Sequence, residues 1–248
     1  MNHYAKLVED IKKIGIHAGM IVFLHSSFKS LGFDGTPQEV IQAFQEVLTT
    51  DGTLLLPALS YKTVDKDHLH FHYYDTPSCV GVISEIFRKS ENVKRSLNPI
   101  HSVCAWGKLQ DIFTQDHEID TITLGEHSPY AKLLQYNAKI CMLGCSLKPN
   151  TFMHYVENMN HVPYRQTKWI RNMTITDASY RSFIKEIHLP DMSSYIQRYD
   201  RIEALLEYPY IIKGHILKAE TYLLDVKAVF RVGSIALKQD LFYFVNQL

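Results

Sequence analysis

Hydrophobic and polar positions along the first sixty residues follow two different periods. Residues Tyr4 to Lys13 place apolar side chains at helical spacing and predict a short amphipathic helix. Met20 to Leu24 is instead a continuous apolar run, and Thr53 to Leu59 is a second one. Continuous runs of this length are typical of strands that are buried on both faces of a parallel sheet. The pattern therefore predicts one helix followed by two buried strands.

The segment between these strands carries the start signals of a helix. Thr36 is placed to cap it, Pro37 suits its first turn, and Glu39 completes a capping box. Apolar side chains then repeat on one helical face, at Val40, Ala43, Phe44, Val47 and Leu48. Strand, helix and strand form a βαβ unit, whose ligands bind beyond the carboxyl ends of the strands. We therefore expect the polar turn His25-Ser26-Ser27 at a ligand-facing edge.

The second half of the chain begins with the same alternation and then changes. Lys139 to Leu143 predicts another buried strand, and Thr151 to Asn158 predicts a helix. Trp169 to Thr176 and Arg181 to Leu189 alternate in polarity, which predicts an antiparallel hairpin. These elements indicate an α/β core with a more antiparallel C-terminal portion.

The last sixty residues give weaker patterns. Pro190 to Glu207 has helical spacing in its second half. We expect Ile211 to Leu224 and Ala228 to Leu237 to form strands, and Gln239 to Leu248 to form a closing helix.

Composition limits the class of protein. The chain has 248 residues, of which 46% are hydrophobic and 21% are charged, as in an ordinary globular protein of one domain. The 26 Lys and Arg residues equal the 26 Asp and Glu residues, so the basic excess of a nucleic-acid-binding protein is absent. No apolar run approaches the roughly 18 residues that span a bilayer. Residues 1–10 lack the apolar core of a signal peptide. We therefore expect a cytoplasmic protein without a nucleic-acid or membrane partner.

Four free cysteines fit a reducing compartment, and their spacing does not indicate a zinc site. They are Cys79, Cys104, Cys141 and Cys145.

The most informative pair of polar residues is His154 and Glu157. They are three residues apart in a predicted helix, so they share one face. A carboxylate beside an imidazole fixes its tautomer and raises its basicity, which suits a general base near neutral pH. Thr151 lies just upstream, where it would cap the helix or donate a hydrogen bond to an oxyanion. Surface helices also carry such pairs, so the spacing alone leaves a structural role open.

Two other residues allow both a chemical and a structural interpretation. Arg95 begins a segment rich in polar residues and is suited either to bind a phosphate or to hold a loop. Cys145 would complete a Cys-His-acid nucleophile with His154 and Glu157, and it would equally serve as a small packing residue.

Two clusters carry the same ambiguity. His68, His70 and His72 would share one face of a strand and could bind a metal, unless they lie in a polar loop. Leu109 to Ala131 contains acidic residues and no Lys or Arg, so it would attract a polycationic substrate, unless it is a solvated loop.

Four blocks of residues, in order along the chain, resemble the aminoglycoside 3-N-acetyltransferase family, also called the antibiotic N-acetyltransferases. The blocks are Val22 to Gly32, Asp75 to Arg88, Arg95 to Gly107, and Ser128 through His154 and Glu157 to the Pro163-Tyr164-Arg165 that follows. They cover residues 20–165. The chain departs from the family at Asn98, where the family usually has a histidine.

This resemblance implies a three-layer α/β/α sandwich with a largely parallel central sheet. It implies acetyl-CoA as the donor, an amino sugar as the acceptor, and direct transfer without a metal or an acyl-enzyme. His154 would be the general base, Glu157 would orient it, and Thr151 would help to stabilise the oxyanion. The residues that it implies for CoA binding are His25, Ser26, Ser27, Phe28, Arg95, Ser102 and Val103.

We expect one acetyltransferase domain, in which residues 1–165 bind CoA and carry the catalytic groups and residues 166–248 contribute to the acceptor site. The acidic segment favours an aminoglycoside acceptor, whereas the diverged C-terminal third favours an amino sugar of surface-polysaccharide synthesis. An acidic cavity would indicate the first, and a cavity with Arg or Lys the second. The alternatives are an inactive CoA- or sugar-binding module and a metal-dependent hydrolase that uses the three clustered histidines with His154. A homodimer is expected only because homodimers are common.

Overall fold

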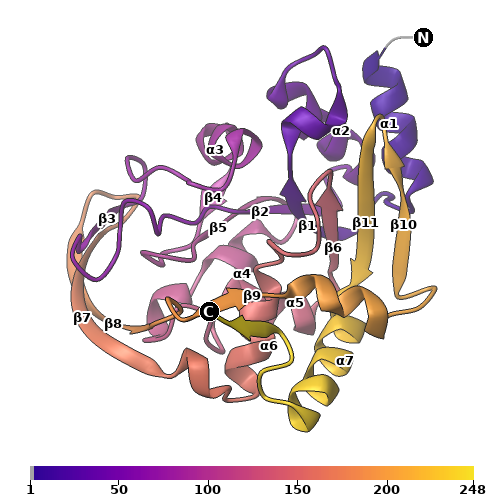
Figure 1. Ribbon diagram of the computed structural model, residues 1–248. Helices are drawn as coiled ribbons and strands as arrows, with labels where there is room; N and C mark the ends of the chain where they lie inside the picture. Colours follow the sequence, from indigo (N-terminus) through magenta and orange to yellow (C-terminus); the bar gives the residue numbers. More distant parts are fainter. Residues whose placement is uncertain (1–2) are drawn as a thin grey trace.

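A seven-stranded sheet forms the centre of the computed structural model, which describes residues 3–248 (Figure 1). Its order is β10-β11-β6-β1-β2-β5-β4. These strands are β1 (Ile21–Ser26), β2 (Thr53–Pro57), β4 (Lys94–Arg95), β5 (Val103–Gly107), β6 (Lys139–Leu143), β10 (Ile211–Ile216) and β11 (Ala219–Asp225). Met1 and Asn2 lie outside the described residues.

Parallel pairing is confined to the middle of this sheet. β1 pairs in parallel with β2 and with β6, whereas β5, β4, β11 and β10 join through antiparallel pairs. Since two successive antiparallel pairs restore the direction, β10, β6, β1, β2 and β4 all run one way. Only β5 and β11 run against them, so the sheet is largely parallel in direction.

Helices cover both faces of the sheet. On one face lie α1 (His3–Lys13), α2 (Pro37–Leu48) and α3 (Val82–Lys89). On the other lie α4 (Gln110–Thr114), α5 (Pro129–Gln135), α6 (Phe152–Met159) and α7 (Val226–Gln239). Alternating residues of β1 supply the two cores, since Val22 and Leu24 pack toward α1 and α2 while Phe23 packs toward α5 and α6. The predicted three-layer α/β/α fold is confirmed.

The helix α2 begins as its sequence predicts. The Thr36 hydroxyl accepts a hydrogen bond from the Glu39 amide at 3.2 Å, and the Glu39 carboxylate accepts one from the Thr36 amide at 2.7 Å. The five apolar residues predicted for its inner face are all buried. The predicted helix over residues 4–13 and the predicted strands that became β1, β2 and β6 are confirmed as well.

A second, three-stranded sheet carries the predicted hairpin. β7 (Thr167–Thr176) and β8 (Ser182–Pro190) pair antiparallel, and β3 (His70–His72) joins β7 in parallel. The sheet stands to one side of the central sheet (Figure 1). It has its own small core, which includes Phe71, Met173 and Ile187.

The C-terminal segment differs from its prediction. Residues 228–237 lie in α7 and not in a strand, because the Asp225 carboxylate caps that helix by accepting the Ala228 amide at 2.8 Å. Residues 239–248 do not form a closing helix. They end in β12 (Val245–Gln247), which pairs antiparallel with β9 (Tyr195–Gln197). The helical spacing expected before residue 207 is a 3₁₀ helix, Tyr199–Leu205.

No helix among residues 3–248 combines the length and the apolar character that a membrane crossing needs.

Candidate active site

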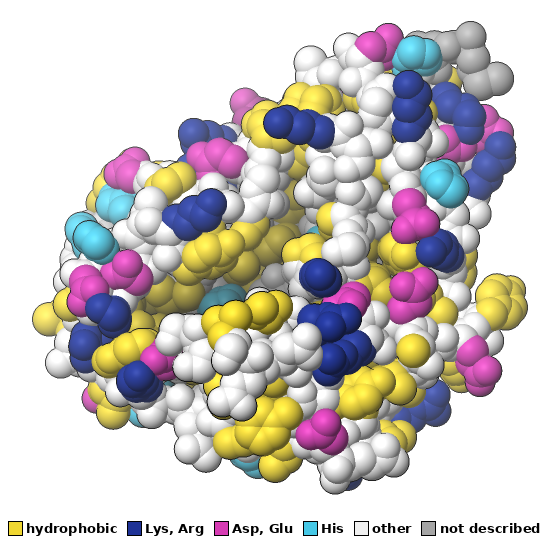
Figure 2. Space-filling view, viewed as in Figure 1, with side chains coloured by type: hydrophobic (Ala, Val, Ile, Leu, Met, Phe, Trp, Pro, Cys, Tyr) yellow, Lys and Arg dark blue, Asp and Glu magenta, His cyan; other side chains and the backbone are white. Residues whose placement is uncertain are grey.

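A cavity of about 700 Å³ opens where the parallel strands end. His25 and Ser26 at the end of β1 line it, as do Pro57 at the end of β2 and the loop that follows β6. Figure 2 shows this hollow with hydrophobic side chains on its walls and Lys and Arg side chains at its edge. The structure thus places His25 and Ser26 at the ligand-facing edge that the βαβ pattern predicts.

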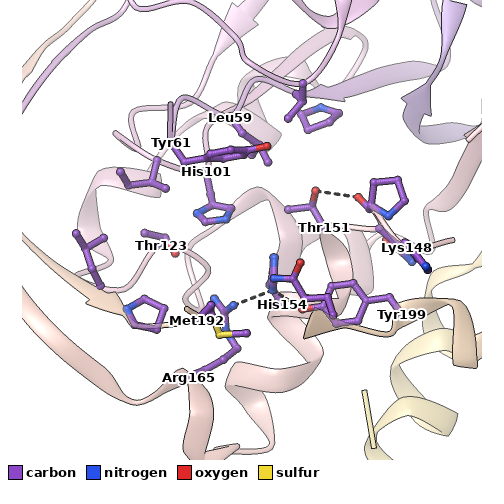
Figure 3. Close-up of a pocket in the computed structure, with 18 of the residues that line it drawn as sticks. Leu59, Tyr61, His101, Thr123, Lys148, Thr151, His154, Arg165, Met192 and Tyr199 are labelled. Atoms are coloured by element: carbon purple, nitrogen blue, oxygen red, sulfur yellow. Dashed lines mark hydrogen bonds between the residues drawn. The ribbon is translucent and has the colours of Figure 1, made fainter. Parts of the chain in front are cut away.

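His154, on α6, lies in the cavity wall with three polar groups around its Nδ1 atom (Figure 3). The Tyr199 hydroxyl is 2.6 Å from Nδ1, the Arg165 Nη1 atom is 2.7 Å away, and the Glu157 Oε2 atom is 3.1 Å away. A carboxylate only accepts, a guanidinium only donates, and a hydroxyl does both. The tautomer of His154 therefore decides which of the three bonds to it. The predicted contact between His154 and Glu157 is present.

Glu157 is fully buried at the base of this cluster. Its Oε2 atom accepts the Tyr199 hydroxyl at 2.8 Å, and its Oε1 atom accepts the Tyr164 hydroxyl at 2.9 Å. The Arg165 Nε atom is 3.7 Å from Oε2 and supplies a positive charge. A buried carboxylate is costly unless it is paired and hydrogen-bonded, and these contacts meet that need. Burial, followed by the charge of Glu157, raises the pKa of both tyrosine hydroxyls, so they remain neutral donors.

The ring of His154 is held neutral. Burial, followed by the charge of Arg165, lowers its pKa, and the opposing contribution of Glu157 does not cancel these two effects. When Nδ1 carries the proton and donates it to Tyr199 or Glu157, the free lone pair lies on Nε2. Among the described residues, Nε2 has no hydrogen-bond partner and is not sealed from the cavity. This geometry allows the ring to accept a proton from a bound molecule.

Thr151 lies at the start of α6 and lines the cavity. Its side chain does not cap the helix, so the capping alternative is wrong. The Asn150 side chain accepts the Phe152 amide instead, at 3.2 Å. The Thr151 hydroxyl is 3.5 Å from the Pro149 carbonyl, which is long for a hydrogen bond. The hydroxyl is therefore able to donate into the cavity instead.

Two more imidazoles line the cavity with a buried nitrogen that has no partner among the described residues. They are His25, through Nε2, and His101, through Nδ1. Burial lowers the pKa of His25 to about 3 and that of His101 well below its ordinary value, so both rings are neutral. The ring centre of His101 is 5.7 Å from that of His154. His101 lies in the third of the four matching blocks, but its sequence neighbours alone indicate no role for it.

Asn98 shapes the loop that carries His101. Its side-chain oxygen accepts the amides of Ile100 at 3.1 Å and of His101 at 2.8 Å. Asn98 does not line the cavity, so its effect on the site passes through the position of this loop.

Three of the residues predicted to bind CoA lie away from the cavity, and this prediction needs correction. Arg95 is buried, and its guanidinium bonds the Ser102 hydroxyl and the carbonyls of Tyr73, Thr76 and Ala58. Its carbon also lies 4.5 Å from the centre of the Phe71 ring. Val103 is fully buried in the core. Arg95 therefore holds a loop, and neither Arg95, Ser102 nor Val103 lines the cavity.

In the turn after β1, contacts within the protein hold Ser27. The Ser27 amide donates to the Leu143 carbonyl at 2.9 Å, and the Ser27 hydroxyl accepts that of Ser30 at 2.8 Å. Phe28 packs against the core beside α2. Of this turn, only His25 and Ser26 line the cavity.

The clustered histidines do not converge on one point. His68 contacts Asp65, His70 contacts Thr176 and His72 contacts Asp75, each at 3.1 Å. Among residues 3–248, no group of three or more His, Cys, Asp or Glu side chains is placed to hold a metal ion. A metal-dependent hydrolase therefore has no supporting site in the described chain.

The acidic segment, residues 109–131, contributes only Thr123 to the cavity wall. Asp111 pairs with Lys94, and Asp120 pairs with His127 at 2.9 Å. The segment is not a solvated loop, because it contains α4 and the start of α5 and buries Asp120, but none of its carboxylates lines the cavity.

Cys145 lines the cavity and also packs against the core. Burial raises the pKa of its thiol to about 12, so the nucleophilic thiolate is not formed near neutral pH. The structure therefore favours the packing role.

Comparison with known proteins gives consistent matches. A model of the aminoglycoside 3-N-acetyltransferase family matches residues 23–238. The chain is 31% identical over 181 residues to the SPbeta prophage-derived aminoglycoside N(3')-acetyltransferase-like protein YokD of Bacillus subtilis, covering 64% of this chain and 65% of that protein. It is 33% identical over 171 residues to aminoglycoside N(3)-acetyltransferase III of Pseudomonas aeruginosa, covering 62% and 63%. These matches span less than two thirds of either relative.

The fold is shared over a greater length. A solved structure described as AAC-IIIb in a binary complex with CoASH superposes with a TM-score of 0.83 at 24% identity, covering 95% of this chain and 96% of that chain.

Proposed function

The chain belongs to the aminoglycoside 3-N-acetyltransferase family, and we propose that it transfers the acetyl group of acetyl-CoA to the amine of an amino sugar. The observation that carries this proposal is the cluster of His154, Tyr199 and Glu157 at the end of the parallel strands. It presents one neutral imidazole to a cavity whose volume of about 700 Å³ is typical of small-molecule sites.

The chain's residues would supply the proton transfers and the electrostatic stabilisation. Acetyl-CoA supplies the thioester carbonyl. His154 Nε2 removes the proton from the amine as its nitrogen bonds the carbonyl carbon, and it returns a proton to the sulfur as the carbon–sulfur bond breaks. Glu157 and the Tyr199 hydroxyl stabilise the transient imidazolium. The Thr151 hydroxyl donates to the developing oxyanion.

The two sides of His154 suggest where each substrate binds. Figure 3 shows Lys148 and Thr151 on one side of the ring, and Thr123, Arg165 and Met192 on the other. We assign CoA to the first side, where His25, Ser26 and the exposed Lys148 line the cavity at the strand ends. This assignment keeps two of the seven residues that the resemblance implied. A relative's description as a CoASH complex supports it.

We assign the acceptor to the second side. Met192 lies on this side in Figure 3, and the cavity wall also includes Trp169 and Leu189; all three come from the C-terminal third of the chain. Tyr199 also comes from that third, so residues 166–248 would contribute to the base as well as to the acceptor site. The domain division that we expected from the sequence is thus proposed with this addition.

The test is release of free thiol from acetyl-CoA by the purified chain, with aminoglycosides and amino-sugar nucleotides as acceptors. We expect His154→Ala to fold and to lower kcat by about 10² to 10⁴-fold, the usual contribution of a general base. His215→Ala, at an exposed position on β10, is the matched control and should keep wild-type activity. A His154→Ala variant that keeps more than about a tenth of kcat would refute the general-base role. CoA binding without thiol release would indicate the inactive binding module instead.

A further inference from the structure

Asp65 supplies the one carboxylate in the cavity wall that residues 3–248 form. It lies in the loop between β2 and β3, and its side chain is 43% exposed. Its Oδ1 atom accepts the amides of Asp67 and His68, both at 2.8 Å, and lies 3.1 Å from the His68 Nδ1 atom. Its Oδ2 atom has no hydrogen-bond or ion-pair partner among the described residues. One oxygen therefore fixes the side chain, and the other is left for a bound molecule.

The hydrogen bonds to Oδ1 also keep this carboxylate ionised. Donation by the amides of Asp67 and His68 lowers the pKa of Asp65, because such bonds favour the charged form. The Asp65 amide in turn donates to the His68 carbonyl at 3.0 Å, so the turn is closed by bonds in both directions. The negative charge is thus held in place before a substrate binds.

The loop that carries Asp65 is attached to the hairpin on the acceptor side. The Arg171 Nε atom, on β7, donates to the Lys66 carbonyl at 2.9 Å, and the Lys66 Nζ atom lies 5.9 Å from the centre of the Trp169 ring. Val64, which precedes Asp65, is buried in the small core of the second sheet. Asp65 therefore lies on the wall that we assign to the acceptor.

The cations that line the cavity do not cancel the charge of Asp65. The Lys66 ammonium pairs with the carboxylate of the next residue, and Arg165 lies 3.7 Å from the Glu157 carboxylate. Lys148, the third lining cation, lies on the side that we assign to CoA. When the lining residues are counted with these partners, the acceptor side keeps one uncompensated charge, which is the negative charge of Asp65.

This charge suits a group other than the amine that reacts. The reacting nitrogen needs a free lone pair, and a carboxylate beside it would instead favour the ammonium form. We propose that Asp65 Oδ2 binds a second ammonium group of the acceptor, and that Asp65 thereby selects acceptors that carry a positive charge in addition to the reacting amine. This assignment rests on the proposed function.

The contact would determine specificity and would not act in the chemical step. It is remote from the reacting atoms, so it stabilises the bound acceptor and the transition state equally. An interaction of this kind lowers KM and leaves kcat unchanged. That separates it from the role of His154, whose loss lowers kcat.

The first experiment compares Asp65→Asn with the wild type at about pH 8, where an ordinary imidazole is neutral. Asparagine keeps an oxygen for the amides of Asp67 and His68 and loses the charge. We would measure KM and kcat by thiol release with kanamycin, which has several amines, and with glucosamine, which has one. We expect KM for kanamycin to rise about five- to tenfold, between the effects of an exposed ion pair and of a buried hydrogen bond to a charged group. KM for glucosamine and both kcat values should not change.

Two other readouts separate the charge from the structure of the loop. Added salt should raise the wild-type KM for kanamycin and should affect Asp65→Asn less, because salt screens an exposed charge. Lys66→Gln removes a positive charge beside Asp65, so it should lower KM for kanamycin about two- to threefold. Asp51→Asn is the matched control, since Asp51 is exposed and precedes β2, whereas the cavity lies where β2 ends.

The outcomes distinguish this inference from the proposed function. An unchanged KM for kanamycin in Asp65→Asn, or equal changes for both acceptors, would overturn the inference alone. A rise of KM in both Asp65→Asn and Lys66→Gln would indicate damage to the loop and would also overturn it. Turnover of kanamycin without turnover of glucosamine would support the selection of a second charge. Absence of thiol release with every acceptor would overturn the proposed function and this inference with it.

Discussion

Replacing Glu157 by Gln tests whether its charge supports the base. The substitution preserves the shape of the side chain and removes the negative charge. In the wild type, this carboxylate accepts the hydroxyls of Tyr164 and Tyr199 and contacts His154 Nδ1 at 3.1 Å. An amide keeps one oxygen acceptor for a tyrosine but cannot neutralise an imidazolium.

The magnitude follows from the type of hydrogen bond that is lost. A buried hydrogen bond to a charged group contributes about 1.5 to 3 kcal/mol. That range corresponds to a fall in kcat of about 10- to 150-fold, since about 1.4 kcal/mol is a factor of ten. The loss should be no greater than that of His154→Ala, and the double variant should resemble His154→Ala because the two residues act as a unit.

The pH dependence gives a second readout. Because Glu157 raises the pKa of His154, its removal should move the acid limb of kcat/KM to lower pH. The wild-type limb should itself lie below the ordinary histidine value of about 6.5. Glu9→Gln, at a half-exposed ion pair with Lys13 on α1, is the control and should match the wild type. Activity of Glu157→Gln within about twofold of wild type, with an unmoved acid limb, would refute the role of this charge.

Two further predictions concern buried groups. We expect no acetyl group on Cys145 in mass spectra taken during the first turnovers, because burial raises the pKa of its thiol to about 12, and an acetylated Cys145 would revive the acyl-enzyme mechanism. Burial also lowers the pKa of His117 to about 3, from the value of about 6.5 that it has in the unfolded state. Between these two values only the unfolded state binds the proton. The contribution of this histidine to the free energy of unfolding is therefore complete above about pH 6.5 and is lost as the pH falls. At pH 5 the loss from this histidine is about 2 kcal/mol. In urea unfolding, His117→Gln should therefore lose less stability than wild type between pH 7 and pH 5, and an equal loss would contradict the reasoning.

Local signals predicted the first half of the fold because each signal and its outcome lie close together in the chain. The capping box at Thr36 and the buried runs of β1 and β2 need no distant partner to be recognised. The wrong strand prediction over residues 228–237 has two origins, a local cap that was not recognised and packing against helices distant in the chain. The apolar residues of α7 suit a strand or a helix, and the choice is made by the Asp225 cap and by packing against α5 and α6.

The candidate site likewise has contacts that the sequence predicts and contacts that only the folded chain creates. The pairing of His154 with Glu157 follows from helical spacing alone. Tyr199 lies 45 positions after His154, in a segment without a motif, and only the fold brings its hydroxyl to the imidazole. Arg95 shows the converse, because its polar neighbourhood suggests a phosphate site while its burial against backbone carbonyls excludes one. Composition of a segment does not reveal which way its side chains face.

Arg165 and Glu157 act on the proposed base in opposite directions. The charge of Arg165 lowers the pKa of His154, whereas the contact with Glu157 raises it. Burial is the largest of the effects and also lowers this pKa, so the ring is neutral in the free protein. A neutral imidazole is the form that accepts a proton, and Glu157 and Tyr199 are placed to stabilise the imidazolium once the proton has been taken.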